Sequence, residues 1–187
     1  VNTNPMYTPR EVEHQLKDSG ATAMVIFENA CSTLQQVLAN TPVRKVIVTG
    51  VGDLLGFPKG PIVNFMLRHV KKMVPAWDLP GAVRFNDVLS RGASLTLDPV
   101  EPGPEDVAFL QYTGGTTGVA KGAVLTHRNL VANTVQIVTW GNLGEIPGAV
   151  VITALPLYHI FALTSNCLTF VYVGGQNVLI TNPRDMK

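Results

Sequence analysis

The chain has 187 residues, of which 46% are hydrophobic and 14% charged; this composition predicts one globular unit with a buried core and excludes a disordered chain. Fourteen basic and thirteen acidic residues give a net charge of +1, so we expect no nucleic-acid partner held by an overall positive field. The two cysteines, Cys31 and Cys167, lie far apart and outside any Cys-x-x-Cys motif, which argues against a structural zinc or a disulfide framework and favours a reducing compartment.

The first fifty residues predict helices that alternate with short buried strands. Residues 8–11 read Thr-Pro-Arg-Glu, a capping box with proline at the first helical position, and Gly20 is placed to end the helix that follows. The apolar runs 23–27 and 45–49 predict parallel strands covered on both faces, with a helix over residues 32–39 between them.

Residues 62–74 predict an amphipathic helix with one basic face. Its basic residues are Arg68, Lys71 and Lys72. One interpretation is a peripheral contact with an anionic membrane surface, and the alternative is an ordinary solvated helix face. The apolar side chains that would assist such a contact are Phe65, Met73 and Trp77.

Three prolines and two carboxylates within residues 98–104 predict an exposed connector, and a second series of elements follows it. We expect strands at 107–112, 123–126, 149–155 and 176–181, a helix at 127–140 capped by Thr126, and a buried helix at 160–173. The whole pattern predicts an α/β fold, a sheet between layers of helices with ligand chemistry at the strand ends.

Residues 146–183 contain no Asp, Glu, Lys or Arg, so a membrane-spanning segment is an alternative for this region. Prolines, His159 and a Gly-Gly pair interrupt it, and its longest helix candidate is shorter than the roughly 20 residues that a bilayer requires. We therefore expect a buried core segment. The sequence begins at Val1 without a charged-then-apolar leader, so we expect no secretory signal and a cytoplasmic location.

Residues 112–122 read Tyr-Thr-Gly-Gly-Thr-Thr-Gly-Val-Ala-Lys-Gly, directly after an apolar run. Glycines let backbone N–H groups face an anion, hydroxyls add donors or metal ligands, and a lysine adds positive charge, so the loop is typical of a nucleotide-phosphate site. Neither the Walker A pattern nor the dinucleotide fingerprint is met. The alternative is a glycine-rich hairpin that connects two strands.

Residues 155–163 read Leu-Pro-Leu-Tyr-His-Ile-Phe-Ala-Leu and place His159 at a predicted strand end, about forty residues after the loop. Taken alone, a histidine in an apolar stretch is more often structural. Together with the loop, however, the segment resembles the Leu-Pro-x-Tyr/Phe-His motif of the acyl-adenylate-forming, or AMP-binding, enzymes. The loop itself resembles their Tyr-Thr-x-Gly-Thr-Thr-Gly-x-x-Lys-Gly signature, with Gly114 where serine is frequent and Ala120 where proline is frequent.

The resemblance extends over nearly the whole chain and is closest to the bacterial long-chain fatty acyl-CoA synthetases. It includes residues 4–8, 11–16, 127–129, 166–168 and 174–177. It implies that residues 1–187 are a partial AMP-binding N-terminal domain, with the connector near 98–104 and the phosphate loop at 112–122. The later family motifs for magnesium, ribose, the interdomain hinge and the C-terminal lysine do not occur in these residues, so we expect the isolated chain to be inactive.

The resemblance implies that a fatty carboxylate attacks ATP to give an acyl-adenylate, which coenzyme A then converts to a thioester. Lys121 and His159 are its catalytic candidates, Thr113 its candidate for Mg²⁺, and Leu163 stands where some members carry an aromatic gate, so chain-length preference stays open. The residues implied for ATP are Thr113, Gly114, Gly115, Thr116, Thr117, Gly118 and Lys121. The residues implied for the acid are Tyr158, His159, Ile160 and Leu163.

Two other functions remain open at this point: a non-catalytic nucleotide-binding module and an adenylating ligase for a different carboxylic acid. The partners implied by the resemblance are a fatty acid, ATP, coenzyme A and the missing C-terminal part of the same chain. A homodimer and a peripheral location on the inner face of the membrane are further hypotheses.

Overall fold

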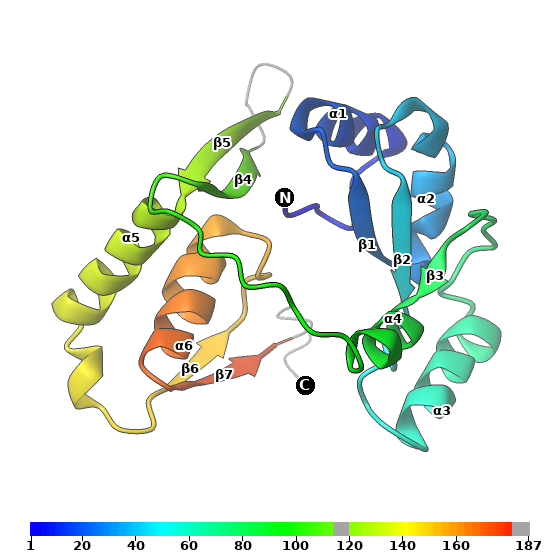
Figure 1. Cartoon of the computed structure of the whole chain (residues 1–187). Helices are drawn as coiled ribbons and strands as arrows, with labels where there is room; N and C mark the ends of the chain where they lie inside the picture. Colours follow the sequence, from blue (N-terminus) through cyan, green and yellow to red (C-terminus); the bar gives the residue numbers. More distant parts are fainter. Residues whose placement is uncertain (114–119, 181–187) are drawn as a thin grey trace. The chain divides into compact units, whose positions relative to one another are not determined.

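The computed structural model describes residues 1–113 and 120–180 and divides them into two compact units (Figure 1). The first unit consists mainly of residues 3–100, and the second of residues 101–113 and 121–180 of the described chain. The α/β fold class predicted from the sequence is confirmed. Over the described residues, the strands form three small sheets instead of one. The sequence did not reveal this division, because its periodicity does not specify which strands pair.

The first unit is built on a parallel sheet in the order β1-β2-β3. Its strands are β1 (Ala23–Phe27), β2 (Lys45–Thr49) and β3 (Val83–Arg84). Ala23 lies opposite Lys45, and Ile47 lies opposite Val83. The bounds and the parallel direction of the two predicted strands are confirmed, and a crossover with helical turns joins them. The expected cover on both faces is not complete, because Val25 and Phe27 of β1 are 57% and 47% exposed.

Short helices surround this sheet. They are α1 (Pro9–Ser19), α2 (Cys31–Gln35), α3 (Lys59–Phe65), a π-helix (Met66–Val70), α4 (Phe85–Gly92), and 3-10 turns at Glu28–Ala30 and Leu38–Asn40. The predicted capping box starts α1: the Thr8 N–H donates to Glu11 Oε2 over 2.8 Å, and the Glu11 N–H donates to Thr8 Oγ1 over 3.4 Å. Gly20 ends the helix with φ of 64°, as its lack of a Cβ allows.

Two predicted helices of the first unit have different bounds in the structure. The helix expected over residues 32–39 is interrupted where the Val37 backbone leaves the helical region, with φ of −126°. The helix expected over 62–74 begins three residues earlier and ends at Val70, because Lys72 adopts a left-handed φ of 50°. These boundaries depend on single backbone torsions, which apolar periodicity does not encode.

The core of the first unit lies between α1, α2 and the parallel sheet. Its fully buried centre is formed by Cys31 and Leu34, both with no exposed surface. The other buried members are Val12, Leu16, Ile26, Val37, Val46, Val48 and Leu79. The alternating burial of β2 results from the period-two geometry of a strand, and it sends two of its valines into this core.

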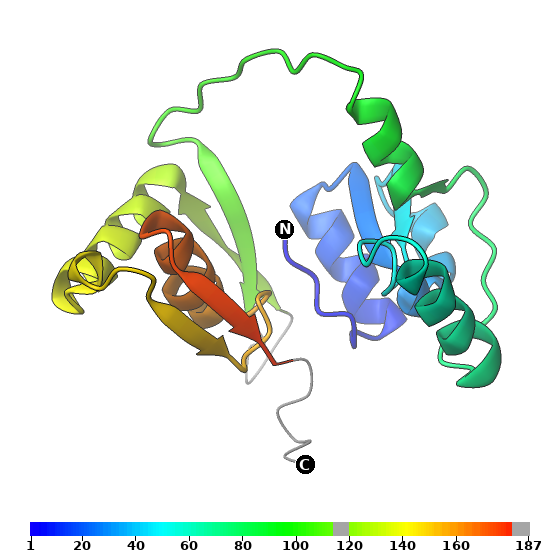
Figure 2. The ribbon, with the colours of Figure 1, turned by 90° about the horizontal axis from the view of Figure 1, so that it is seen from below.

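The second unit contains an antiparallel hairpin, β4 (Val107–Thr113) with β5 (Lys121–Thr126), and a parallel pair, β6 (Val150–Thr153) with β7 (Gln176–Leu179). Helix α5 (His127–Trp140) has the bounds and the Thr126 cap that the sequence predicts. A 3-10 turn (Leu143–Glu145) follows. A π-helix (Ala162–Leu168) continues into α6 (Thr169–Tyr172), and Figure 2 shows this segment alongside α5.

Residues 160–172 of the second unit are helical, close to the predicted 160–173, but the helix is not buried throughout. Ala162 and Thr169 have no exposed surface, whereas Val171 and Tyr172 are 71% and 63% exposed. This segment is therefore a half-buried surface helix. Within the described residues, no helix is both long enough and apolar enough to cross a membrane.

Candidate functional site

The hairpin of β4 and β5 brings two of the predicted ATP residues together. Thr113 is the last residue of β4, Lys121 is the first residue of β5, and the strand register places them directly opposite each other with both side chains exposed. The register thus brings a residue with a hydroxyl group and a residue with an ammonium group to the same end of the hairpin, next to the predicted phosphate loop. The other predicted phosphate-binding residues lie outside the described residues: Gly114, Gly115, Thr116, Thr117 and Gly118.

Gly122 has a packing role that the loop motif alone does not reveal. It faces Tyr112 across the hairpin, and a Cβ at this position would lie 2.9 Å from the Cζ atom of that ring. The tyrosine is 7% exposed. Because glycine has no side chain, the ring of Tyr112 can lie directly against β5. This packing fixes Tyr112, the residue directly before Thr113.

The hairpin is attached firmly to the helix that follows it. Thr126 and Asn129 form a reciprocal capping box at the start of α5. The backbone N–H groups of His127 and Arg128 donate to Asp106 O over 3.1 Å and to Pro104 O over 2.8 Å. The end of the predicted connector is thus held to the start of α5, whereas residues 98–102 are all exposed.

The second predicted motif lies in the turn between β6 and the helical segment. His159 is exposed, and its backbone N–H donates to Pro156 O over 2.9 Å. Its Nδ1 accepts a hydrogen bond of 3.3 Å from the Phe161 N–H, so in the neutral ring the proton lies on Nε2. Nε2 of this exposed residue can therefore donate a hydrogen bond to a carboxylate or phosphate oxygen.

The other predicted acid-binding residues differ in their exposure. Leu163 is buried, with 8% of its surface exposed, and Tyr158 and Ile160 are half-buried. A hydrogen bond joins this segment to the hairpin, because Gln111 Nε2 donates to the Tyr158 carbonyl over 3.1 Å. The sequence interpretation missed Gln111, although an amide at the end of the otherwise apolar run 107–110 was a signal that could have found it.

An apolar hollow of about 440 Å³ lies elsewhere in the second unit, between β4, α5 and α6. Its lining residues are Ala108, Phe109, His127, Leu130, Val131, Thr134, Leu168, Val171 and Tyr172. None of the residues predicted for the acid is among them. The hollow is thus separate from the motif that the sequence assigns to substrate, and the apolar periodicity of the sequence did not reveal it.

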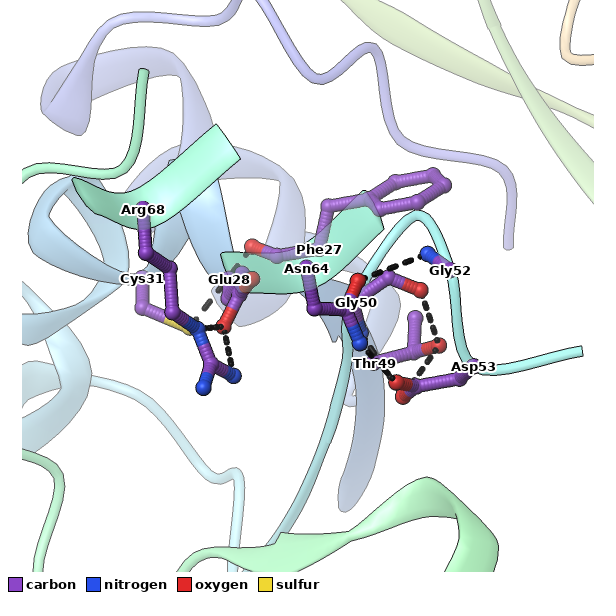
Figure 3. A network of polar contacts seen from close by, with 9 residues as sticks. All are labelled: Phe27, Glu28, Cys31, Thr49, Gly50, Gly52, Asp53, Asn64 and Arg68. Carbon is purple, nitrogen blue, oxygen red and sulfur yellow. Dashed lines mark hydrogen bonds and ion pairs between the residues drawn. The ribbon is translucent and has the colours of Figure 1, made fainter. Parts of the chain in front are cut away.

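A closed polar network follows the carboxyl end of β2 in the first unit (Figure 3). Asp53 accepts hydrogen bonds from the Gly50 N–H over 2.8 Å, from Thr49 Oγ1 over 3.2 Å and from Asn64 Nδ2 over 2.8 Å. Asn64 Oδ1 accepts in turn from the Gly52 N–H over 2.7 Å. These groups satisfy one another, so the network fixes the turn after β2 against α3.

The neighbouring carboxyl end of β1 carries a partly buried ion pair (Figure 3). Glu28 is 4% exposed, and its Oε2 accepts from Arg68 Nε over 2.8 Å and from Arg68 Nη2 over 2.5 Å. Hydrogen bonding to Glu28 raises the pKa of the Arg68 guanidinium. Burial, with a smaller contribution from the Glu28 charge, raises the pKa of the Cys31 thiol to about 11, so this cysteine stays protonated and unreactive near neutral pH.

The ion pair shows that the predicted basic face of residues 62–74 was partly wrong. Arg68 is occupied by Glu28 and is not free for an anionic surface. Trp77, which was expected to assist a membrane contact, packs instead against the core of the first unit. Sequence spacing placed Arg68 on the basic face because it could not foresee a partner 40 positions away. Lys71 and Lys72 remain exposed.

The described residues offer Mg²⁺ few protein ligands. Across residues 1–113 and 120–180, no group of three or more His, Cys, Asp or Glu side chains could hold a metal ion. The Thr113 hydroxyl, predicted as a ligand of Mg²⁺, would offer one oxygen atom at the hairpin end, where this residue is exposed. This fits an ion that binds mainly through substrate phosphates and water, as Mg²⁺ commonly does, and does not fit a magnesium site built by these residues alone.

The comparisons with known proteins identify the family. A model of the AMP-binding enzyme family matches residues 1–187. The chain belongs to the AMP-binding enzymes. It is 56% identical over 187 residues to a long-chain-fatty-acid–CoA ligase of Escherichia coli O6:H1, an alignment that covers the whole chain but 33% of that relative. This AMP-binding chain therefore spans about a third of the length of the curated relatives it matches, and the predicted resemblance is confirmed.

Solved structures agree with this family assignment. The chain resembles a long-chain-fatty-acid–CoA ligase from Archaeoglobus fulgidus with a TM-score of 0.59 and 28% identity, over 95% of this chain and 29% of the other. It also resembles ATP-bound MatB from Rhodopseudomonas palustris with a TM-score of 0.66 and 23% identity, over the same shares of the two chains. The second likeness shows the fold that these AMP-binding chains share.

Proposed function

We propose that the parent of this chain is a long-chain fatty acid–CoA ligase, which activates a fatty acid with ATP and transfers the acyl group to coenzyme A. The observation that carries the proposal is the 56% identity to the Escherichia coli ligase along the whole chain. The opposed Thr113 and Lys121 at the hairpin end support it, because a hydroxyl and an ammonium group suit a polyphosphate.

In the first step, a fatty carboxylate oxygen attacks the α-phosphorus of ATP and pyrophosphate leaves, which gives an acyl-adenylate. Two anions must approach each other, so the chief task of the protein is to neutralise charge and to orient the reactants. Lys121 and Thr113 would hold the β- and γ-phosphates together with Gly114, Gly115, Thr116, Thr117 and Gly118. Mg²⁺ carried by the phosphates would supply further charge neutralisation.

His159 would position the acid instead of removing a proton, because a fatty carboxylate is already ionised near neutral pH. Its exposed ring and the Nε2 donor support this role. Tyr158, Ile160 and Leu163 would form the adjoining part of the acid pocket. In the second step, the coenzyme A sulfur attacks the acyl carbon, AMP leaves and the thiol proton is released.

The proposal also includes a peripheral membrane contact through Lys71 and Lys72, whose exposed ammonium groups suit an anionic surface. Phe65 and Met73, 59% and 58% exposed, would enter the interface. We expect Lys71→Gln with Lys72→Gln to reduce sedimentation of the parent with anionic liposomes, while Lys17→Gln, on another helix, serves as the control. Equal sedimentation of all forms would refute the contact. A homodimer remains a hypothesis.

The experiment that tests the proposed function is ATP–pyrophosphate exchange by the full-length parent with acids from acetate to oleate. Exchange stimulated chiefly by long chains is the expected result. Stimulation chiefly by another acid would keep the adenylation step and refute the fatty-acid substrate. ATP binding without exchange for any acid would favour the non-catalytic nucleotide-binding module.

A further inference from the structure

Gln111 is a buried amide placed between the two motifs that the proposed function uses. It lies in β4, two residues before Thr113, and is 7% exposed. A buried amide without a hydrogen-bond partner destabilises the fold. The partners of the Gln111 amide therefore indicate which segment this side chain holds in place.

The nitrogen and the oxygen of this amide differ in their hydrogen bonding. Nε2 donates to the Tyr158 carbonyl over 3.1 Å and lies 3.4 Å from the neighbouring Tyr112 carbonyl. Oε1 is buried and has no hydrogen-bond partner among the described residues. The contact that this side chain makes is therefore through its donor, Nε2. Its partner, Tyr158, lies 47 residues later in the sequence and directly before His159.

The other hydrogen bonds around His159 are local. Its N–H donates to Pro156 O, its carbonyl accepts from the Leu163 N–H over 3.0 Å, and its Nδ1 accepts from the Phe161 N–H. These bonds shape the turn but do not fix it relative to the hairpin. The bond from Gln111 supplies that link, because it joins the strand that ends in Thr113 to the segment that carries His159.

We propose that Gln111 is a positioning residue that holds the Tyr158–His159 segment in place for the acid and thereby sets the KM for the fatty acid. This inference rests on the proposed function. The ATP side of the site does not depend on the Gln111 side chain, because the backbone register of β4 and β5 places Thr113 opposite Lys121. Loss of the amide should therefore affect one substrate and spare the other.

The first test is Gln111→Met in the full-length parent, a change that keeps an unbranched side chain of similar size and removes the donor. In ATP–pyrophosphate exchange, we expect the KM for oleate to rise about 10-fold, the size expected for one lost buried hydrogen bond. The KM for ATP should stay within about twofold of the wild-type value. A variant that was merely less folded would lower the maximal rate and leave both KM values unchanged.

The second test is Gln111→Glu, which gives a pH signature that loss of packing cannot imitate. A protonated carboxyl group can donate its O–H to the Tyr158 carbonyl, whereas an ionised one cannot. Burial raises the pKa of a carboxyl group, so the donor should return as the pH is lowered from 8.5 to 6. We expect the ratio of the oleate KM of Gln111→Glu to that of wild type to fall over this range, while the ratio for Gln111→Met stays constant.

Gln15→Met is the matched control, because Gln15 is also a buried glutamine, 1% exposed, and lies in α1 of the first unit. Thermal denaturation of each variant shows whether it is folded, and only folded variants are compared. If Gln111→Met does not fold, Gln111→Glu at pH 6 still tests the inference, because its protonated carboxyl group keeps the donor. The inference is wrong if folded Gln111 variants keep the wild-type oleate KM, or if the KM values for oleate and ATP rise together. Absence of exchange by the wild-type parent would instead overturn the proposed function, and this inference with it.

Discussion

The two units of the chain differ in how their important contacts are made. In the first unit, the parallel strands, α1 and α2 bury a core made mainly of aliphatic side chains, and the Asp53 carboxylate accepts its hydrogen bonds close to the end of β2. In the second unit, Thr113 and Lys121 are exposed at the hairpin end and His159 is exposed in a turn, and a side-chain hydrogen bond from Gln111 to Tyr158 joins the two segments. If the proposed function is right, substitutions in the core of the first unit should act mainly on stability, and substitutions at the exposed residues of the second unit should act mainly on activity.

The largest expected effect on stability is at the centre of the first unit. Leu34→Ala should lower the free energy of unfolding of the chain by about 3 kcal/mol, because the side chain is completely buried and the cavity would not fill. Chemical denaturation checks this value. Leu97→Ala, at a position 89% exposed, is the control and should change it by less than about 0.5 kcal/mol. Equal losses would contradict the assignment of the core.

The largest expected effect on activity is at the hairpin of the second unit. Lys121→Ala in the parent should lower the rate of ATP–pyrophosphate exchange by about 100-fold, the usual effect of losing one preorganised electrostatic group. Stability should change little, because the ammonium group is exposed. Lys45→Ala, at an exposed lysine of β2, is the control. An unchanged rate for Lys121→Ala would remove this residue from the mechanism.

The elements of the first unit were largely predictable because their signals are local. The capping box at Thr8, the left-handed Gly20 and the two apolar strands follow from neighbouring residues, and the structure confirms them. Non-local partners were not predictable. Neither the Arg68 ion pair with Glu28 nor the bond from Gln111 to Tyr158 has a periodic signature, so sequence reasoning mistook the first for a free cation and overlooked the second.

Disrupting a polar network inside the second unit should have an intermediate effect on the free energy of unfolding. Thr153, 2% exposed, donates from Oγ1 to Asn177 Oδ1 over 2.8 Å and accepts from Asn166 Nδ2 over 3.0 Å. Thr153→Val keeps the shape and leaves both amides with an unmet hydrogen bond, so we expect a loss of about 1.5 kcal/mol in unfolding free energy. Thr153→Ser, which retains the hydroxyl, is the matched comparison in chemical denaturation. Equal losses for the two variants would contradict this cause, because Thr153→Ser keeps the hydroxyl that makes both hydrogen bonds.

The smallest expected effect is electrostatic and depends on pH. The backbone and side chain of Thr8 donate hydrogen bonds that lower the pKa of Glu11 in the folded chain. A lowered folded-state pKa stabilises the fold above the pKa of the unfolded chain, and this contribution is lost as the pH falls through the folded value. Glu11→Gln keeps the capping-box geometry without the charge, so the difference in unfolding free energy from wild type should be small at pH 7 and disappear towards pH 3. A difference that is constant with pH would contradict this cause.

The central claim is that a fatty carboxylate attacks the α-phosphorus of ATP in the parent enzyme. It is tested most directly by supplying oleate labelled with ¹⁸O in its carboxyl group, together with ATP, Mg²⁺ and coenzyme A, and measuring the mass of the released AMP. The account predicts AMP that carries one ¹⁸O atom from the oleate, because the attacking oxygen stays on the phosphorus when the thiol displaces AMP. Oleoyl-CoA formed alongside unlabelled AMP would contradict it.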